Sequence, residues 1–577
     1  MSATTVPSAA TRPLRLPVRL QGALVAWAPL VAGVIVTLPL LLLLVNSFNI
    51  AAPGREAVYG LANWVQAFSD PTTLRALWNS VALGAVRTAI SLPIAISVAW
   101  LIARSDMPGR SVIEVLCWLG IFLPLLPLTF GWILLLDPQY GLVNQVVGRL
   151  PFVEGSLFNI YGFLGITWVH LASSTIYYKV VLLVPAFRRV GASLEEAARM
   201  SGANQLTTLR RVTIPLLAPA VLGVTVLAFV RSLEVFEVEL LLGKPANISV
   251  YSTRIYDLVR DQPPRFGEAT ALGFVFLLML LGLAIMQQWY VRGKSFTTVT
   301  GRGYTAMPVR LGGWGKAAAA VCFGWFVVAM AAPLTFLVLG SFMRRYGFFQ
   351  LANPFTLAQW QNLFGDPVFF SSVRNSLIIS VAVAIGVVVV YSLVAYSIVR
   401  LPSLPSRLTD LLVWVPWAVP GILLSLGLLW LFLGTPLRSV LYGSITGIIV
   451  AMVIKDSPLS TQFFKASFLQ IGTELEESAR VSGASWLQTY WRVLLPLLAP
   501  TAVTVGLLSF LSALRDISTP VLLYSAQSRP LSILMLEYSF SGEMERGAAI
   551  GVLVTVFVMA VTLVARAVGL RLARERA

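Results

Sequence analysis

The chain contains apolar segments, free of charged residues, that are as long as a bilayer-spanning helix or longer. Residues 20–54, 269–291 and 547–565 hold no Asp, Glu, Lys or Arg. A helix crosses the hydrocarbon core of a bilayer with about 20 predominantly apolar residues. Only 12% of all residues are charged, which is about half the share found in soluble domains. We therefore expect an all-α protein that crosses the membrane many times.

Apolar runs separated by charged breaks predict about 12 membrane spans. They lie at 23–47, 80–103, 113–136, 161–185, 216–238 and 269–291 in the first half, and at 317–341, 376–399, 411–433, 443–467, 497–522 and 547–565 in the second. The first run follows basic residues, as a secretory signal does, but it exceeds the about 7–15 apolar residues of a signal. We expect it to be retained as the first helix.

The positions of Lys and Arg predict the orientation. If the N-terminus is cytoplasmic, the inner loops and tails hold roughly 23 basic residues and the outer loops roughly 13, which fits the positive-inside rule. Both termini are then cytoplasmic. The net charge of +17 is scattered over these loops without the aromatic and basic platform of a nucleic-acid site, so we expect membrane lipid and no nucleic acid as a partner. Cys117 and Cys322 lie apart in apolar runs and predict neither a disulfide nor a metal site.

The two halves are copies of one module. Trp64 and five other residues recur 296 positions later, the others being Phe68, Asp70, Pro71, Asn79 and Ser80. A second stretch, 194–219, aligns with 475–500 at an offset of 281. The first half is therefore 15 residues longer between the two stretches, and we place the extra residues in the outer loop around 137–160, where insertions are tolerated. Because each half has an even number of spans, the repeats are parallel, and two such halves can enclose a path.

These features divide the chain into five predicted parts. They are a cytoplasmic tail at 1–22, a first module at 23–292, a cytoplasmic linker at 293–316, a second module at 317–566 and a cytoplasmic tail at 567–577. Each module carries one repeated cytoplasmic loop, at 186–215 and at 468–496.

Each repeated loop predicts a short helix that begins just outside the membrane. Ser193 with Glu196, and Thr473 with Glu476, have the spacing of a capping box. The helix has about two turns and is marginal in water on its own. Its small residues leave one face low enough to lie in the groove of a partner protein.

A glycine ends each of these helices. Gly202 and Gly483 can adopt the left-handed conformation of a helix end without strain. Pro215 and Pro496 follow, where we expect the chain to re-enter the membrane. The alternative, which gives the loops no docking role, is that they are ordinary amphipathic segments repeated by gene duplication.

The segments EEAARMSGANQLTTLRRVTIPLL and EESARVSGASWLQTYWRVLLPLL resemble the EAA motif of permease subunits of bacterial type I ABC importers, in which a coupling helix docks on the ATPase subunit. Two copies in one chain resemble the fused permeases of that family, the inner-membrane components of binding-protein-dependent transport typified by ferric-iron, thiamine and aminoethylphosphonate permeases. The resemblance covers nearly the whole chain apart from the tails and the linker. Ser478 replaces the first alanine of the motif in the second copy, a change of one small residue for another.

The resemblance implies two six-helix type I permease modules in the bacterial cell (inner) membrane. It implies that the chain is not an enzyme and binds no cofactor, and that ATP and Mg are bound by two copies of a separate ATPase subunit while a periplasmic protein delivers the substrate. The sequence agrees, since it contains no G-x-x-x-x-G-K-[ST] segment to hold phosphates. The residues implied in ATPase coupling are Glu195, Glu196, Ala197, Ala198, Gly202, Pro215, Glu476, Glu477, Ser478, Ala479, Gly483 and Pro496.

Charged and polar residues inside spans are costly and tend to mark transport paths. The candidates for the path are Glu234, Glu237, Arg515, Asp516, His170, Lys455 and Asp456. The glutamates could attract a cation or hold the two halves together. Lys455 and Asp456 are expected to pair with each other, and His170 to make a hydrogen bond between helices. We expect Lys179 to extend to the cytoplasmic surface, and Asn79 and Asn375 to cap or join helices at the outer face.

The predicted function is uptake of a delivered solute by alternating access, with ferric iron as the first choice of substrate and thiamine, a polyamine or 2-aminoethylphosphonate as alternatives. An ion-coupled secondary transporter is the rival from another class, because such transporters also use internal repeats. A membrane-embedded enzyme would need a catalytic constellation that the sequence lacks.

Overall fold

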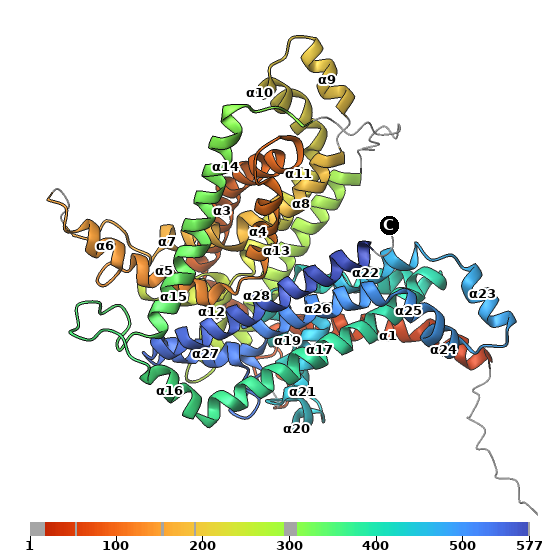
Figure 1. Cartoon of the computed structure of the whole chain (residues 1–577). Coiled ribbons are helices and arrows are strands. Elements are labelled where there is room, and N and C mark those ends of the chain that lie inside the picture. The colour runs from red at the N-terminus through yellow and green to blue at the C-terminus, as the bar shows by residue number, and fades with distance from the viewer. Residues whose placement is uncertain (1–17, 52–54, 152–154, 190–191, 293–307, 575–577) are drawn as a thin grey trace, which may run out of the picture.

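The computed structural model describes residues 18–51, 55–151, 155–189, 192–292 and 308–574 (Figure 1). Within these ranges the chain is helical, with isolated β-bridges and no β-strand. The all-α expectation is confirmed.

The helices of the first half are α1 (Val18–Ser47), α2 (Ala62–Ser69), α3 (Pro71–Arg104), α4 (Arg110–Phe122), α5 (Leu125–Leu136), α6 (Leu142–Val147), α7 (Phe163–His170), η1 (Leu171–Thr175), α8 (Ile176–Arg189), α9 (Ala192–Met200), α10 (Gln205–Thr208), η2 (Leu209–Thr213), α11 (Ile214–Leu233), η3 (Glu239–Gly243), η4 (Lys244–Ala246), α12 (Tyr251–Arg260) and α13 (Phe266–Arg292).

The helices of the second half are α14 (Gly313–Phe326), η5 (Val327–Ala331), α15 (Ala332–Ser341), α16 (Ala358–Gly365), α17 (Pro367–Arg400), α18 (Leu404–Leu412), η6 (Val415–Ala418), α19 (Gly421–Leu433), α20 (Arg438–Leu441), α21 (Ile445–Lys455), α22 (Ser457–Phe468), α23 (Glu474–Val481), α24 (Trp486–Thr489), η7 (Tyr490–Leu494), α25 (Leu495–Leu497), α26 (Ala499–Arg515), η8 (Pro520–Leu522), α27 (Leu531–Phe540) and α28 (Met544–Arg574).

Seven helices among the described residues are long and apolar enough to cross a membrane, or ten if each of three bent helix pairs forms one span. The two remaining predicted spans, 411–433 and 443–467, hold shorter helices. Prolines account for the breaks, because proline lacks the N–H that would continue a helix. Pro416 lies before α19, and Pro458 lies in the first turn of α22. Pro124 separates α4 from α5, which bend by 100°.

The second span of each half is longer than its apolar run. Helices α3 and α17 each contain 34 residues, because an Asp-Pro pair starts them before the apolar run begins. Asp70 accepts a hydrogen bond from the backbone N–H of Thr72, and Asp366 accepts one from Val368. An aspartate cap followed by proline at the first helical position is a strong start signal, although the sequence analysis noted these residues only as part of the repeat.

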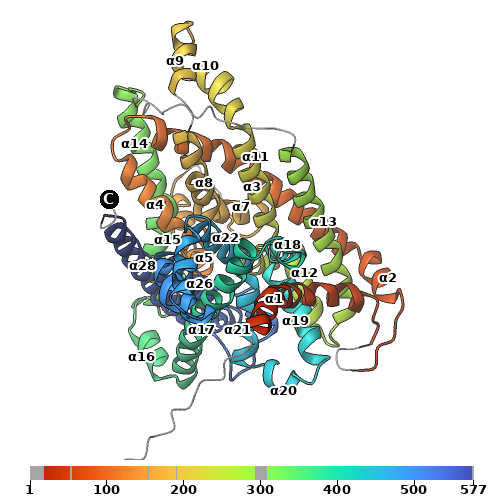
Figure 2. The same cartoon turned by 90° about the vertical axis from the view of Figure 1, so that its right-hand side faces the viewer.

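The first span of each half packs against the other half. Helix α1 contacts α17, α18 and α19, and α14 with α15 contacts α4 and α5 (Figures 1 and 2). Glycines at repeat-related positions permit this crossover. A Cβ added at Gly131 would collide with the backbone of Pro333, and one added at Gly427 would collide with the backbone of Pro39. The two halves are therefore interlocked.

Candidate functional site

Two short helices, α9 and α23, project from the helical body at separate places (Figure 1). The chain after each helix turns at a glycine with a left-handed backbone, φ +84° at Gly202 and +83° at Gly483. This confirms the predicted helix ends. An added Cβ at either glycine would meet no atom within 4 Å, so the backbone conformation, and not crowding, requires glycine at these two positions.

The outer faces of α9 and α23 are accessible. Met200 and Val481, at the C-terminal ends of the two helices, are each 90% exposed. Among the residues implied in ATPase coupling, several are exposed while Ala198 and Ala479 are half-buried; the exposed ones are Glu196, Ala197, Gly202, Pro215, Glu477, Ser478, Gly483 and Pro496. Pro215 and Pro496 are the second residues of α11 and α25. Each helix thus keeps a free surface of small and apolar side chains.

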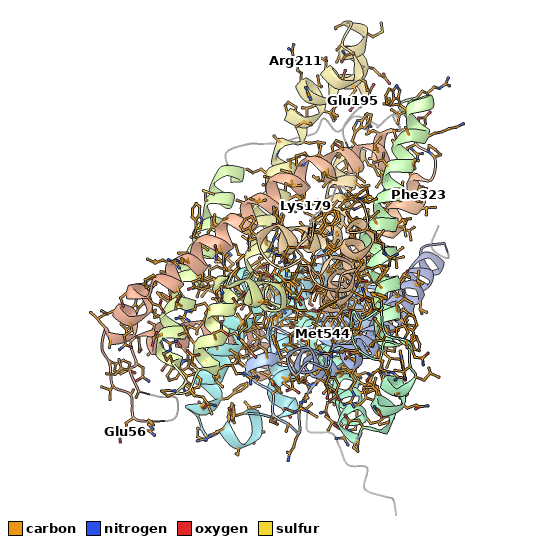
Figure 3. The ribbon with its side chains drawn as sticks, turned by 90° about the vertical axis from the view of Figure 1, so that its left-hand side faces the viewer. Glu56, Lys179, Glu195, Arg211, Phe323 and Met544 are labelled. Atoms are coloured by element: carbon orange, nitrogen blue, oxygen red, sulfur yellow. The ribbon has the colours of Figure 1, made fainter. Side chains whose placement is uncertain are left out.

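The first glutamate of each repeated loop faces inward. Glu195 is buried and forms an ion pair with Arg104 at the end of α3, and it accepts a hydrogen bond from Thr213 Oγ1 at 2.8 Å. Glu476 is also buried and pairs with Arg400 Nε, at the end of α17, at 2.7 Å. Figure 3 shows Glu195 at the projecting end of the first half. The two first glutamates are therefore bonded within the chain and are not free for a partner.

The predicted capping box of the second loop does not form. Thr473 lies just before α23 as expected, but its side chain accepts no capping hydrogen bond. Glu476 instead forms a charge-assisted contact with Arg400. A capping box occurs one helix later, between Ser485 and Gln488 at the start of α24, where the sequence analysis missed it. The side chain of Ser193 lies outside the described residues.

A buried charged triad lies within the first half. Glu239 Oε1 accepts from Arg87 Nη2 at 2.5 Å and lies 3.0 Å from His170 Nε2. The predicted interhelical hydrogen bond of His170 is confirmed. The sequence analysis missed Arg87 and Glu239, although an arginine inside a span is itself a signal. The second half carries Val383 at the position of Arg87, so the triad has no full counterpart there.

Several charged residues predicted for the path lie near the contact between the halves. Lys455 Nζ pairs with Asp516 at 2.7 Å, so the predicted pairing of Lys455 with Asp456 is wrong. The cause is geometric, because adjacent residues on a helix point in directions about 100° apart and Asp456 lies just after the end of α21. Glu234 pairs with Arg231 at 3.0 Å.

Other path candidates bridge or border the same region. Arg515 Nη1 donates to the carbonyl O of Ile121, in the other half, at 2.8 Å. Glu237 is partly exposed and lies within electrostatic range of Lys455 and Asp516. The site therefore mixes acidic and basic groups from both halves. Among the described residues no group of three or more His, Cys, Asp or Glu side chains could hold a metal ion.

Lys179 does not reach the surface as predicted. It is fully buried, and its Nζ donates to Ser91 Oγ at 2.7 Å and to the carbonyl O of Thr175 at 3.1 Å. Figure 3 places it inside the first half. The prediction rested only on the closeness of Lys179 to the cytoplasmic end of its span. The π-helical turn η1, in which Ser173 leaves the helical conformation, lies just before it.

The N-terminal parts of α3 and α17 are joined to the chain before α12 and α27 in the same way. Asn79 Nδ2 donates to the carbonyl O of Ser249 at 2.9 Å, and Asn375 Nδ2 donates to that of Gln527 at 2.8 Å. The expectation that these asparagines join helices is confirmed.

A hydrogen-bonded chain links the halves at this end. Arg260 of α12 donates to the Tyr524 hydroxyl at 2.9 Å, which donates to Glu537 of α27 at 2.8 Å. Burial raises the pKa of Tyr524 above its ordinary value, against the opposing effect of Arg260. The phenol therefore stays protonated and able to donate to Glu537 at neutral pH. We call Arg260, Tyr524 and Glu537 the inter-half latch.

Two interlocked helical modules, a projecting glycine-ended helix on each and charged groups from both halves at their contact define a transport permease. Comparison with known families agrees with this class. Residues 91–295 and 389–574 each match the family model described as "Binding-protein-dependent transport system inner membrane component". The chain belongs to this family, as a fused two-module permease of the type I fold and a multi-pass inner-membrane protein. The family is a transport component and not a catalytic subunit.

Relatives of the chain are named for the transport of different substrates. A probable ABC transporter permease protein, y4fN of Sinorhizobium fredii, is 28% identical over 86% of this chain and 88% of its own length. The ferric transport system permease protein FbpB of Actinobacillus pleuropneumoniae is 26% identical over 73% of this chain, which spans 62% of that relative. The molybdenum transport system permease protein ModB of Escherichia coli is 27% identical over 38% of this chain and 93% of its own length.

Proposed function

We propose that the chain is the membrane-spanning subunit of an ATP-driven importer and that α9 and α23 are the helices on which two copies of an ATPase subunit dock. The observation that carries this proposal is the repeated pair of projecting helices, each ended by a left-handed glycine and each with an exposed outer face. A two-turn helix is stable only when it leans on something. The inner face of each helix leans on its own module through a buried glutamate, which leaves the outer face for a partner.

The mechanism that this arrangement supports is alternating access. Closure of two ATP-bound ATPase subunits draws α9 and α23 together and tilts the halves, which opens the path to the outside, and hydrolysis reverses the motion. A periplasmic binding protein delivers the solute. This chain binds no cofactor, since ATP and Mg belong to the ATPase, and both termini and both repeated loops lie in the cytoplasm.

Ferric iron is our first choice of substrate, with thiamine, a polyamine or 2-aminoethylphosphonate as alternatives. The ferric transport permease among the relatives supports iron. The acidic path candidates support it less, because Glu234 and Asp516 are bonded to Arg231 and Lys455 and carry little free negative charge. We therefore place selectivity with the binding protein, and a thermal-shift assay of that protein with each solute identifies the substrate.

Substitution of the two glycines tests the docking role. We expect Gly202→Asp and Gly483→Asp to lower uptake per ATP hydrolysed, because each adds a charged side chain to the exposed end of a docking helix, at a position where glycine takes positive φ at no steric cost. Insertion into the membrane should be normal, since neither glycine is packed against another atom. The measurement is uptake and ATP hydrolysis by the full complex in proteoliposomes.

Gly155→Asp is the matched control, because Gly155 has φ +78° and equally open surroundings but lies in the 137–160 loop, which we predict on the opposite side of the membrane. Normal coupling in both loop variants, alongside a normal control, would count against the docking role. The rival, an ion-coupled transporter, predicts uptake that a protonophore or sodium removal abolishes and no ATPase bound to the purified chain.

A further inference from the structure

We infer that the ion pairs Glu195–Arg104 and Glu476–Arg400 are the links that carry motion of each docking helix into the second span of its own half. This inference rests on the proposed function. It assigns to the first glutamate of each repeated loop a role inside the membrane subunit, distinct from that of Glu196 and Glu477, which are exposed.

Each link joins a projecting helix to the end of a long span. Arg104 is the last residue of α3 and Arg400 is the last residue of α17, and both helices contain 34 residues. The side chains of Glu195 and Arg104 are 5% and 6% exposed, and those of Glu476 and Arg400 are 7% and 12% exposed. An ion pair so shielded from water is screened little by salt and holds its geometry when the helix is pushed.

Both halves contain this ion pair, although the sequence offset between the two copies differs for its arginine and its glutamate. Arg104 and Arg400 are 296 positions apart, as are the repeated residues near Asp70, whereas Glu195 and Glu476 are 281 apart, as are the loops. The arginine and the glutamate therefore come from segments whose separation along the chain differs between the two halves. The ion pair between them is formed in both modules. The surroundings have diverged, since Thr213 bonds to Glu195 while Tyr396 bonds to Glu476.

The link of the first half also reaches the second half. Directly beside Arg104, the backbone forms a bridge with the predicted linker just before α14: Val309 N–H donates to the carbonyl O of Arg104 at 2.8 Å, and Asp106 N–H donates to that of Val309 at 3.1 Å. The Asp106 side chain accepts from Leu311 N–H at 2.8 Å. Helix α14 begins two residues later. A push on α9 is thus delivered both to α3 and to the first span of the other half.

The test is to remove one charge of each link in the full importer. We expect Glu195→Gln and Glu476→Gln to leave the ATPase bound but to lower uptake per ATP hydrolysed by about 3- to 30-fold, the range seen for substitutions along a coupling route. The charge-swapped variant, Glu195→Arg with Arg104→Glu, should recover most of the loss. Glu114→Gln, which breaks the half-exposed pair between Glu114 and Arg188 on the same side of the first half, is the matched control and should couple normally.

The outcomes separate the link from the docking role. Unchanged uptake per ATP in both glutamine variants overturns the link, and so does loss of the bound ATPase, because the glutamates would then be docking contacts. Absence of any ATPase on the wild-type chain overturns the proposed function itself. If the glutamine variants do not insert, the charge swap decides: coupling as poor as in the single arginine variant Arg104→Glu contradicts the inference.

Discussion

Lys455 and Asp516, both in the second half, form an ion pair near the contact between the halves that their positions in the sequence do not reveal. The two residues are 61 positions apart and their charged atoms are 2.7 Å apart. Asp516 is also bonded to Ser518 at 3.0 Å. Because the carboxylate is only 9% exposed, loss of the ammonium would leave a nearly buried charge without compensation.

We therefore predict that Lys455→Met lowers the free energy of unfolding by about 3 kcal/mol, and that adding Asp516→Leu recovers most of this, since a buried pair can be replaced by apolar groups at little cost. Thermal unfolding of the detergent-solubilised protein measures both. Lys244→Met, which breaks the mostly exposed pair with Asp257, should cost no more than about 1 kcal/mol. A loss of the same size in both single variants would show that burial of Asp516 is unimportant.

The conformation and bonding of a residue could be predicted where they depend on that residue and its neighbours in the chain. They could not be predicted where they depend on contacts between distant segments. Left-handed φ at Gly202 and Gly483 follows from glycine at a helix end, and the hydrogen bond of His170 follows from a lone polar group in a span. In contrast, the direction of Lys179 depends on the π-helical turn before it. Glu195 turns inward because α3 ends beside it at Arg104, about 90 residues earlier in the chain.

At the level of elements, close approach of the backbone at two glycines fixes the crossover of the first spans. A Cβ at Gly131 of α5 would overlap the backbone of Pro333, and the repeat-related Gly427 of α19 faces Pro39 in the same way. Backbone atoms cannot move aside as a flexible side chain does. The helices would have to separate.

We predict that Gly131→Ala and Gly427→Ala each destabilise the protein by about 1–3 kcal/mol, the usual cost of overpacking a core. Thermal unfolding in detergent is the measurement. Gly282→Ala in α13 is the control, because its Cβ would meet nothing within 4 Å, and it should be neutral or slightly stabilising. Equal stability of all three variants would mean that the first spans are not held by these contacts.

Apolar runs predicted the existence of the spanning helices better than their form. Helices α3 and α17 begin about nine residues before the apolar runs because Asp70 and Asp366 cap them. The run at 113–136 contains a 100° bend at Pro124. Hydropathy averages over such breaks, whereas caps and prolines, which the sequence also displays, mark them. The crossover could not be predicted from the sequence, because an internal repeat does not say which copy a span packs against.

At the scale of the whole molecule, the halves are joined by the inter-half latch while α9 and α23 lie apart (Figure 1). We expect this state to have the path closed at the latch end. Arg260→Met should weaken the closure by about 1.5 kcal/mol, the loss of one hydrogen bond from a charged donor, and so raise ATP hydrolysis without the binding protein about tenfold. Hydrolysis by the reconstituted complex, with and without the binding protein, measures it; an unchanged basal rate would show that the latch does not restrain opening.

The limits of the two modules, the cytoplasmic position of the termini and the roles of the coupling residues stay predictions, and all of them depend on what contacts α9 and α23. Cysteine cross-linking addresses that contact directly. Met200→Cys and Val481→Cys lie on the exposed ends of the two helices, and the native Cys117 and Cys322 are buried and can be replaced by serine.

The account predicts that each new thiol, in the assembled importer, forms a cross-link to a subunit that carries the G-x-x-x-x-G-K-[ST] phosphate loop and hydrolyses ATP, and that the yield changes when ATP is bound. Leu157→Cys, an exposed residue of the loop that we predict on the opposite side of the membrane, should form none. Cross-linking of neither α9 nor α23 to such a subunit, in a complex that transports its substrate, would contradict the central claim that these two helices connect the membrane subunit to its source of energy.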